Sequence, residues 1–446
     1  MSCCNDFTRA QVLRAAAGKG LPAVEPGMPT PAGTGMDRRS FLLRSAGLAL
    51  SVYGAGSLAP GALEEGVAMA AEAGDHPVLV SIFLSGGIDG LSVLAPHEDA
   101  KYLSLRPTLK VTGGTPLAED PRLVWNPAAA PLQGLYDAGK VSVMPAMGYT
   151  SPNQSHFTSR HFWEVGSLDV QARTGWLGRY LDRVGEPNNA IQGLSLEGQL
   201  SPTLATSSVA VAATSSVSDY RFTSPGLWDR GVEARMHESF HRLGTATSTN
   251  PVLGQARQAQ VNAAILRQQL ATLPADTGTV TYPSSGVATR LKSLARMLGA
   301  GLPVRCATMN ATGSYDTHSG QATPFTSGLQ ATSAAIAAFQ ADLEARGLAD
   351  RVLVHLWSEF GRRPEENGSA GTDHGAAGVG FVIGTRAAGT MIGEYPGLGS
   401  LDAEGNVRAT SDFRALYCSL LEDWLGTEAE GIVPGASAFP RYAVVK

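Results

Sequence analysis

Residues 76–85 read HPVLVSIFLS, and this run decides the fold class. It is almost continuously apolar and rich in β-branched side chains, which is typical of a strand buried on both faces of a parallel sheet. Further runs of this kind follow at residues 141–145 (VSVMP), 304–310 (VRCATMN), 352–357 (VLVHLW) and 381–383. We predict that these runs are strands of one sheet.

Segments with helical spacing separate these strands. They cover residues 131–139, 259–273, 288–298, 329–348 and 411–425. Strands that alternate with helices indicate βαβ units. We therefore predict an α/β fold with a doubly wound, mostly parallel sheet flanked by helices. The Ala/Ser/Thr-rich residues 202–218 are predicted to belong to a peripheral insertion near residues 200–250.

Composition excludes several classes of protein. The chain has 446 residues, of which 43% are hydrophobic and 16% are charged, against about 25% charged residues in an ordinary globular protein. This composition suits a folded chain with a large core and excludes a disordered one. The net charge is -5 and no basic run is present, so the chain is not predicted to bind nucleic acid. Four cysteines are too few for a disulfide scaffold.

The N-terminal region resembles a twin-arginine export signal. Residues 36–50 read MDRRSFLLRSAGLAL, with Arg38 and Arg39 ahead of an apolar run. That run is broken by glycines and is shorter than the roughly 20 apolar residues of a membrane-spanning helix. We expect residues 1–73 to be removed during export by the twin-arginine translocase. The mature chain would be one domain, residues 74–446, in the periplasm or outside the cell, without a stable transmembrane segment.

Two cysteines remain in that mature chain, Cys306 and Cys418. In an oxidising compartment they would be able to form a disulfide. Two buried thiols fit the sequence equally well.

Acidic and histidine residues gather after the predicted strands. Open α/β sheets build their sites beyond the carboxyl ends of the strands. Oxygen and nitrogen side chains collected there are typical ligands of zinc or manganese. Taken singly, each residue also fits a helix cap or an ordinary surface side chain. Together they predict a divalent metal site formed by Asp89, Asp316, His318 and Glu359, and by Asp373 and His374 of a glycine-rich loop.

Seven motifs in one order resemble the exported family known as domain of unknown function 1501 (DUF1501). They are SIFLSGGIDGLSVLAP, SPNQSHFTSRHFWEVG, TGWLGRYLD, GSYDTHSGQ, HLWSEFGRRP, GTDHG and SDFRALYCSLLEDWLG. The resemblance implies a relation to the alkaline phosphatase and sulfatase superfamily. Members of that superfamily hydrolyse or transfer phosphate and sulfate esters, usually at a site with two metal ions. The implied fold is alkaline-phosphatase-like.

The resemblance also assigns roles to individual residues. Asp89 resembles the acid after the first strand, which contacts the metal nearer the nucleophile. Asp316 and His318 resemble the ligand pair of the other metal, and His374 resembles the last histidine ligand. Under a competing alignment, Asp373 and His374 with the following glycine are the superfamily's Asp-His-Gly motif.

Phe360 departs from the superfamily pattern. Under the preferred alignment Glu359 stands at the Asp of the Asp-His-Gly motif, and Phe360 stands where a histidine should follow. The metal nearer the nucleophile would then have only oxygen ligands, from Asp89, Glu359 and Ser155, which suit magnesium, manganese or calcium. A one-metal site of Asp316, His318 and His374 is equally consistent. The cofactor is therefore expected to be one or two divalent ions of zinc, manganese, magnesium or calcium.

Three residues are candidates for catalysis. Ser155 opens a predicted helix, where N–H groups favour an anionic ester, and it is the candidate nucleophile. Its alternative role is a helix N-cap, and Thr150 and Ser151 are rival nucleophiles. His156 is a candidate metal ligand or transition-state donor, or else a packed histidine. Arg362 is a candidate clamp for an oxyanion, or else a surface charge.

These features favour an exported, metal-dependent hydrolase of phosphate or sulfate esters. The alternative is a catalytically reduced relative that binds an envelope polymer or a partner protein, and Phe360 favours this alternative. The expected partners are an anionic ester substrate or an envelope polymer.

Overall fold

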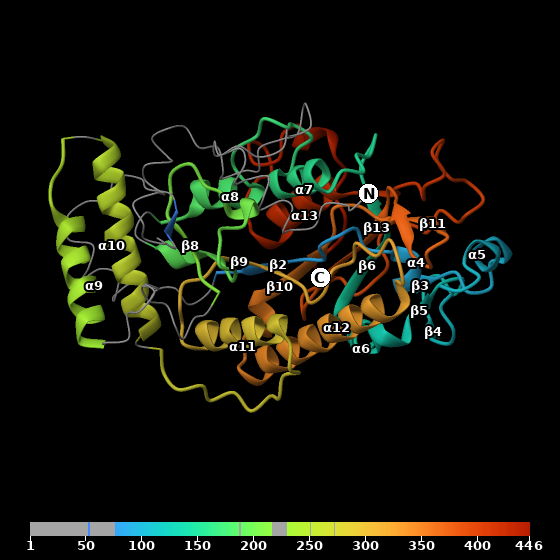
Figure 1. Ribbon diagram of the computed structural model, residues 1–446, viewed down its shortest axis with the longest axis horizontal. Coiled ribbons are helices and arrows are strands. Elements are labelled where there is room, and N and C mark those ends of the chain that lie inside the picture. Colours follow the sequence, from blue (N-terminus) through green and yellow to red (C-terminus); the bar gives the residue numbers. More distant parts are fainter. Residues whose placement is uncertain (1–51, 54–75, 187–188, 216–229, 250, 272) are drawn as a thin grey trace.

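The computed structural model describes residues 52–53, 76–186, 189–215, 230–249, 251–271 and 273–446. Within this part, one sheet has the strand order β1-β8-β7-β9-β2-β10-β13-β6-β14 (Figure 1). In that order the strands are β1 (Val52–Tyr53), β8 (Val211–Ala213), β7 (Gly193–Ser195), β9 (Cys306–Asn310), β2 (Val78–Phe83), β10 (Val352–Trp357), β13 (Gly378–Ile383), β6 (Val141–Gly148) and β14 (Ser411–Asp412). Only β1 and β13 run antiparallel to their neighbours, so the predicted α/β fold with a mostly parallel sheet is confirmed.

Strand β2 lies inside the sheet, paired in parallel with β9 on one side and β10 on the other. All six of its residues are buried. A strand with neighbours on both edges and helices over both faces has no water-exposed side, so apolar residues occupy every position. The run at residues 76–85 is therefore the strand that its sequence predicts.

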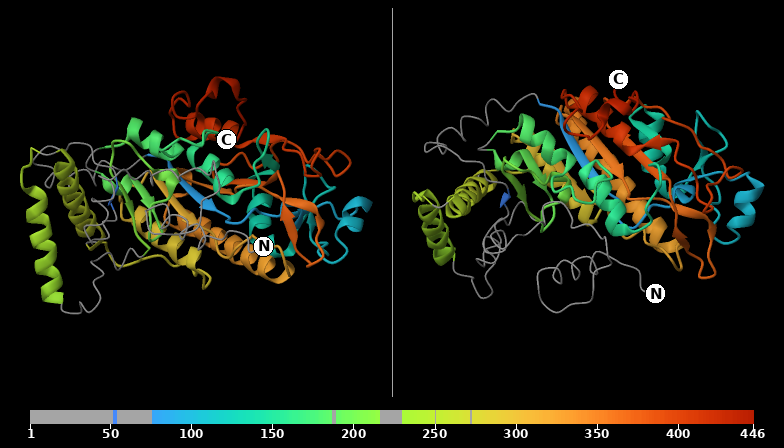
Figure 2. Two further views of the ribbon diagram at one scale, coloured as in Figure 1. Left: turned by 45° about the horizontal axis from the view of Figure 1, so that its top comes forward. Right: turned by 90° about the horizontal axis from the view of Figure 1, so that it is seen from above.

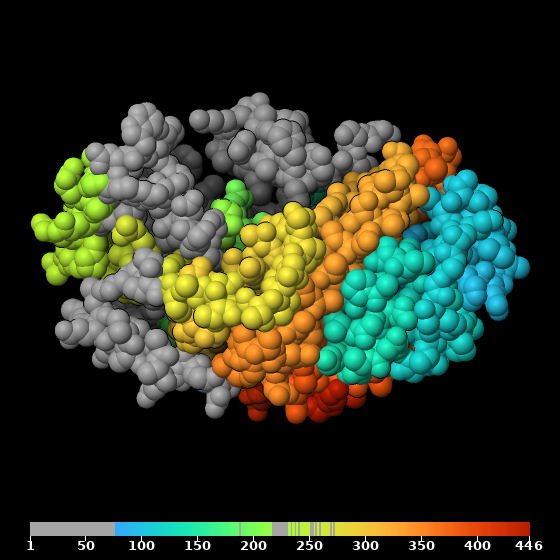
Figure 3. All heavy atoms as spheres, turned by 90° about the horizontal axis from the view of Figure 1, so that it is seen from below, coloured from blue at the N-terminus to red at the C-terminus, as the bar shows by residue number. Residues whose placement is uncertain are grey.

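Helices cover both faces of the sheet (Figure 1). One layer holds α6 (Ala130–Asp137), α11 (Gly286–Gly299) and α12 (Ala322–Ala345), which lie side by side in Figure 3. The other layer holds α7 (His156–Val165), α8 (Trp176–Val184) and α13 (Phe413–Ser419), which continues as a π-helix over Leu420–Trp424. Each layer buries its own apolar cluster against the sheet. The predicted helices at residues 131–139, 288–298, 329–348 and 411–425 are thus confirmed, with shifted ends.

Smaller elements extend the two ends of the sheet. Helices α9 (Arg230–Thr245) and α10 (Pro251–Ala271) pack against each other at the β8 end, far from α5 (Ala100–Leu105), as Figure 2 shows. At the other end lie α4 (Gly90–Val93) and a small sheet of β3 (Leu94–Ala95), β5 (Val124–Trp125) and β4 (Thr115–Pro116). A hairpin of β11 (Arg362–Glu366) and β12 (Thr372–His374) stands beside them. Short 3-10 helices occupy Pro127–Ala129, Ala190–Gln192, Pro202–Leu204, Ala349–Arg351 and Ala436–Ala438.

Two sequence expectations need correction. Residues 202–218, expected in a peripheral insertion, include β8, which is buried and pairs with β7 in the main sheet. Asp373 and His374, expected in a glycine-rich loop, lie in β12, where His374 pairs with Arg362 of β11. Strand β12 escapes detection because its three residues, Thr372–His374, are all polar. Strand β8 lies in an apolar run at residues 209–213, but that run does not show which sheet it joins.

Three further expectations concern the export signal, the absence of a transmembrane segment and the state of two cysteines. The paired arginines and the cleavage region lie outside the described residues, so the boundary at residue 73 stays a prediction. Within the described part, no helix has the length and apolarity needed to cross a bilayer. Cys306 and Cys418 are both buried and free.

His355 is a buried base in the middle of β10. Its side chain is fully buried, and neither ring nitrogen has a hydrogen-bond partner among the described residues. Burial lowers the pKa of His355 from 6.5 to about 3. The ring is therefore neutral in the folded protein at every pH above this value.

Replacing His355 with leucine is expected to weaken the acid sensitivity of folding. Between pH 6.5 and 3 the unfolded chain binds a proton here that the folded chain does not. Stability is therefore lost as pH falls, by up to about 1.4 kcal/mol per pH unit. Urea unfolding of both proteins at pH 8 and pH 5 measures the difference. From pH 8 to pH 5, the free energy of unfolding of His355→Leu should fall by about 2 kcal/mol less than that of the unmodified protein. The same stability difference between the two proteins at both pH values would contradict this.

Candidate metal centre

The site lies at one edge of the sheet, where the carboxyl ends of β9, β2, β10 and β6 meet. Asp316 and His318 follow β9, and Glu359 directly follows β10. His156 is the first residue of α7, after β6. His374 is the last residue of β12, in the hairpin that follows Glu359. Parallel strands deliver these side chains to one place because their carboxyl ends share an edge.

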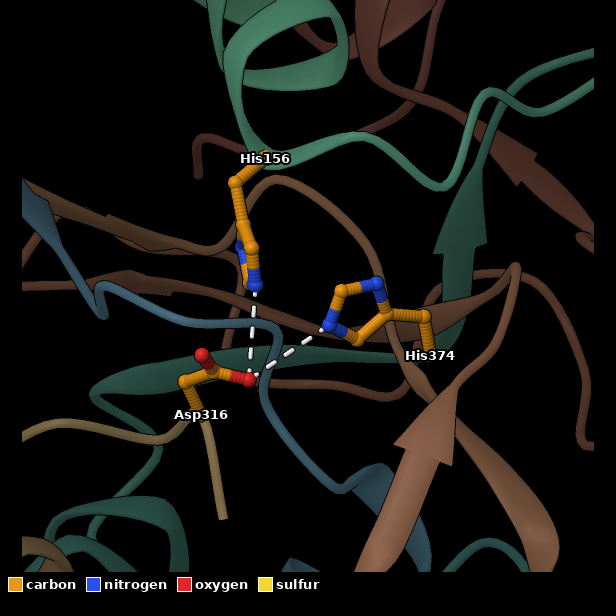
Figure 4. A group of neighbouring side chains, drawn as sticks. All are labelled: His156, Asp316 and His374. Carbon is orange, nitrogen blue, oxygen red and sulfur yellow. Dashed lines mark hydrogen bonds and ion pairs between the residues drawn. The ribbon is translucent and has the colours of Figure 1, made fainter. Parts of the chain in front are cut away.

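Three imidazole rings surround the carboxylate of Asp316. Its Oδ1 lies 3.4 Å from Nε2 of His156, 3.4 Å from Nε2 of His374 and 3.0 Å from Nε2 of His318. Figure 4 shows His156 and His374 approaching this carboxylate from α7 and β12. The ligand atoms of His156, Asp316 and His374 all lie within 4.8 Å of one another. This spacing suits side chains that hold one metal ion.

The other nitrogen of each ring is bound by an acceptor. Nδ1 of His156 lies 2.7 Å from Oε1 of Glu359, and Nδ1 of His318 lies 3.1 Å from Oδ1 of Asp373. Nδ1 of His374 lies 2.8 Å from the main-chain oxygen of Gln154. Carboxylate and carbonyl oxygens only accept, so each Nδ1 donates. Every Nε2 atom is thereby turned toward Asp316, and anchoring of Nδ1 by an oxygen acceptor is the usual arrangement of histidine ligands.

The Nε2 atoms themselves lack good hydrogen bonds. Nε2 of His156 is buried and has no partner in hydrogen-bond geometry within the described part of the chain. Nε2 of His318 and Nε2 of His374 face each other at 2.9 Å, and when each Nδ1 carries a proton, neither of these atoms is a natural donor. A cation between the rings would satisfy all of these atoms. The donor set therefore fits a divalent metal.

Electrostatics at the site depend on the central carboxylate. Burial opposes ionisation of Asp316, but its close neighbours His156, His374 and Arg362 hold its pKa well below the ordinary value. Burial also opposes protonation of His156, but Asp316 and Glu359 raise its pKa to about 9. Burial and the neighbouring charges of His156 and Arg362 lower the pKa of His374. In the metal-free protein, His156 thus carries the charge that a cation would supply.

Glu359 lies at the site, but its oxygens are engaged. The side chain is buried and accepts hydrogen bonds from the main-chain N–H groups of Gly86 and Gly87, at 3.0 and 3.1 Å. It also accepts from the hydroxyl of Ser358 at 2.9 Å and from Nδ1 of His156. These bonds offset its burial and lower its pKa. Its contacts make Glu359 the residue that orients His156.

Asp89 is bound by a different group of residues. Its carboxylate forms a buried ion pair with Arg106, at 2.5 and 3.0 Å, and accepts from the hydroxyl of Ser92 at 2.6 Å. The side-chain amide of Gln321 donates to it as well. Burial opposes ionisation of Asp89, but Arg106, Ser92 and Gln321 together hold its pKa below the ordinary value. These contacts give no support to the ligand role expected for Asp89, and we leave it out of the ligand set proposed below.

Replacing Asp89 with asparagine is expected to destabilise the protein without changing its metal affinity. The substitution leaves Arg106 buried without its counter-charge, which costs about 3 to 5 kcal/mol. Urea unfolding measures this loss, and metal titration of the same variant measures affinity. Loss of metal binding by folded Asp89→Asn would return Asp89 to the ligand set.

Arg362 is fully buried, and each of its five N–H groups has an acceptor in the described chain. It donates to the main-chain oxygens of Gly86, Gly87 and Thr372 and to Oδ1 of Asp316. Its remaining N–H lies 3.4 Å from Nε2 of His318. The oxyanion clamp expected for Arg362 therefore finds no free donor, and the geometry instead suits a residue that fixes Asp316.

Asp373 and Phe360 border the three histidines. Asp373 is exposed and accepts from His318 and from the amide of Asn367, so it lies behind His318. Phe360 is buried, and its ring centroid lies 4.8 Å from those of both His156 and His374. An apolar ring thus packs where the superfamily pattern predicts another ligand.

Ser155 is the N-cap residue of α7, yet its side chain makes no capping hydrogen bond. It stands between Gln154, whose carbonyl binds His374, and His156, whose ring faces Asp316. Ser155 is therefore next to the site in the chain, and its hydroxyl is not used as a cap. The sequence did not reveal the role of the Gln154 carbonyl, because any residue type supplies one.

One comparison with known proteins shows the family of the chain. Residues 143–422 match the family described as "Protein of unknown function (DUF1501)". No curated protein matches the chain. Solved structures do, among them the PsFucS1 sulfatase from Pseudoalteromonas sp., at 13% identity and a TM-score of 0.34, covering 83% of this chain and 73% of that one.

Two other solved structures show the same degree of likeness. A protein in the alkaline phosphatase superfamily from Vibrio parahaemolyticus has 10% identity, a TM-score of 0.34 and coverage of 97% and 78%. The C-terminal periplasmic domain of EcEptC from Escherichia coli, in complex with Zn, has 10% identity, a TM-score of 0.37 and coverage of 81% and 86%. Likeness of this size carries no argument about the reaction of this chain.

Proposed function

The chain belongs to the DUF1501 family, and on that premise we propose that it is an exported, metal-dependent hydrolase of phosphate or sulfate esters. One observation carries the proposal. Three histidines have Nδ1 anchored to an oxygen acceptor and direct Nε2 toward one carboxylate oxygen of Asp316. Such an arrangement is expensive to maintain without a cation, because nitrogen lone pairs would face each other unpaired.

The contacts favour one ion, held by His156, Asp316 and His374, with His318 beside them. Glu359 and Asp89, the acids expected at a second ion, are already bound by other protein groups. A set rich in imidazole favours zinc or manganese over magnesium or calcium.

The neighbouring residues suit ester hydrolysis. A bound divalent cation would polarise an ester oxygen and ease removal of the hydroxyl proton of Ser155. The Ser155 Oγ would then bond to phosphorus or sulfur, and the bond from that atom to the leaving oxygen would break. The proton of Ser155 would pass to Nε2 of His318, the most exposed of the three rings at 32%, and from there to the leaving oxygen. Water would then hydrolyse the ester formed on Ser155.

The test is hydrolysis of aryl phosphate and aryl sulfate esters by the purified mature chain. Metal is first removed with a chelator, and zinc, manganese, magnesium or calcium is then restored. Activity that is lost with the chelator and returns with zinc or manganese is the expected result. If the protein bound metal but hydrolysed neither ester, the alternative function would be favoured, namely binding of an envelope polymer or partner protein. Phe360 supports this alternative because it stands where a further histidine ligand was expected.

Export by the twin-arginine pathway is a separate part of the proposal. Replacing Arg38 and Arg39 by lysine is expected to hold the precursor in the cytoplasm, because the pathway recognises the arginine pair. Cell fractionation and immunoblotting of precursor and mature chain measure this. Normal cleavage and export of the double variant would show that another pathway carries the chain.

A further inference from the structure

The turn at Gly86 and Gly87 connects β2 with the site, and only glycine fits it. Both residues have positive φ, 113° and 77°. A Cβ on Gly86 would lie 2.2 Å from the main-chain nitrogen of Asp316, and a Cβ on Gly87 would lie 2.4 Å from the ring of Phe360. The turn therefore packs closely against the main chain of Asp316 on one side and the ring of Phe360 on the other.

Two charged side chains hold opposite groups of this turn. Glu359 accepts from the N–H groups of Gly86 and Gly87. Arg362 donates to the carbonyl oxygens of the same two residues. The peptide unit between Gly86 and Gly87 is therefore bound on both sides, through its N–H by Glu359 and through its carbonyl oxygen by Arg362, which restrains the turn.

Each of the two side chains also reaches one candidate ligand. Glu359 accepts from Nδ1 of His156 at 2.7 Å, and Arg362 donates to Oδ1 of Asp316 at 2.7 Å. The side chains of Glu359 and Arg362 are 2% and 0% exposed, so neither is placed to meet substrate. The glycine turn thus joins His156 and Asp316 through one hydrogen-bonded chain.

We infer that Glu359 and Arg362 are positioning residues that set the distance between His156 and Asp316 through the Gly86–Gly87 turn. The inference rests on the metal site of the proposed function and adds its supporting residues. Because the turn is fixed by the fold, the two ligands are held in place before any cation arrives. Pre-organisation of this kind raises metal affinity, since binding then orders few side chains.

Glu359→Gln tests the first contact while keeping the shape of the side chain. The carboxylate accepts from Gly86 and His156 at Oε1 and from Gly87 and Ser358 at Oε2. A glutamine has one acceptor oxygen, so it loses one of these two pairs of hydrogen bonds. If its NH2 group faces His156, Nδ1 must become the acceptor and the proton moves to Nε2, the nitrogen that faces Asp316. We expect affinity for zinc, measured by competition with a chromophoric chelator, to fall about 10- to 100-fold.

Glu164→Gln is the matched control. Glu164 is equally buried and lies on α7, the helix that carries His156, but it pairs with Arg160 at 2.7 Å. This control should keep the zinc affinity of the unmodified protein. Glu359→Asp, which retains a carboxylate, should recover part of the affinity that Glu359→Gln loses.

Arg362→Lys tests the second contact, with Arg106→Lys as its control. Both arginines are fully buried and ion-paired, but Arg106 binds Asp89. A lysine cannot reproduce the planar fork of donors, so Arg362→Lys should also lose about 10- to 100-fold in zinc affinity. The visible spectrum of bound Co2+, which reports ligand geometry, should change for Arg362→Lys and Glu359→Gln only.

The outcomes separate this inference from the proposed hydrolysis. Circular dichroism first establishes that each variant is folded. Unchanged zinc affinity and Co2+ spectrum in folded Glu359→Gln and Arg362→Lys would overturn the inference alone. An equal loss in the two control variants would also overturn it, because burial rather than position would then be the cause. An unmodified protein that binds no metal would overturn both.

Discussion

Replacing Asp316 with alanine is expected to lower zinc affinity more than about 100-fold, beyond the effect of an outer residue, and to abolish ester hydrolysis. Oδ1 of Asp316 is the one atom near which all three Nε2 atoms lie. Its removal leaves the three imidazole rings without the carboxylate that lies between them. Equilibrium dialysis followed by elemental analysis measures bound metal, and an aryl ester assay measures turnover.

The same substitution should also reduce stability, for a separate reason. Arg362 is fully buried and loses its only carboxylate partner among the described residues. A buried charge left without its partner typically costs about 3 to 5 kcal/mol. Asp182→Ala is the control, because Asp182 is a half-buried carboxylate that binds Ser207 and Ser208 far from the histidines. Full metal content in folded Asp316→Ala would remove Asp316 from the ligand set.

Ser155→Ala is expected to keep its metal and lose turnover, by about 1,000-fold or more if the hydroxyl is the nucleophile. Stability should change by less than about 0.5 kcal/mol, because the Ser155 side chain makes no capping hydrogen bond. The two measurements therefore separate a chemical role from a structural one. A metal titration, a thermal melt and an ester assay on one preparation provide the comparison.

An active Ser155→Ala would transfer the nucleophile elsewhere. Thr150 and Ser151 are the nearest hydroxyls in the same loop, and Ser151 has a positive φ of 56°, which is uncommon for a residue with a Cβ. Single alanine variants of both residues would then be assayed. Activity in all three variants would leave a metal-bound water as the attacking group.

The sequence predicted the sheet well because its signals are local. A buried strand such as β2 shows its burial in six consecutive residues, and α12 shows an apolar stripe along its own length. Strands β8 and β12 have only three residues each, and the three residues of β12 are all polar. So short a segment does not show from its sequence alone which sheet it joins.

At the site, residue types were predicted more readily than roles. Asp316, His318 and His374 were expected together and do lie together. Whether a carboxylate faces a cation or a guanidinium depends on contacts that the local sequence does not reveal. Asp89 is bound by Arg106, and Glu359 is bound by a turn 273 residues earlier. His156, expected as a catalytic group or ligand, meets Asp316 only because α7 begins at the same sheet edge.

The Gly86–Gly87 turn has a consequence for the order of events during folding. Its contacts with Glu359 span 273 residues, and the parallel pairing of β2 with β10 spans a similar length of chain. Closing so long a loop is entropically costly and is among the slower steps of folding. Cation capture should therefore coincide with the last stage of refolding, and the rate at which a chelator-based dye loses zinc to the refolding chain would time that stage directly.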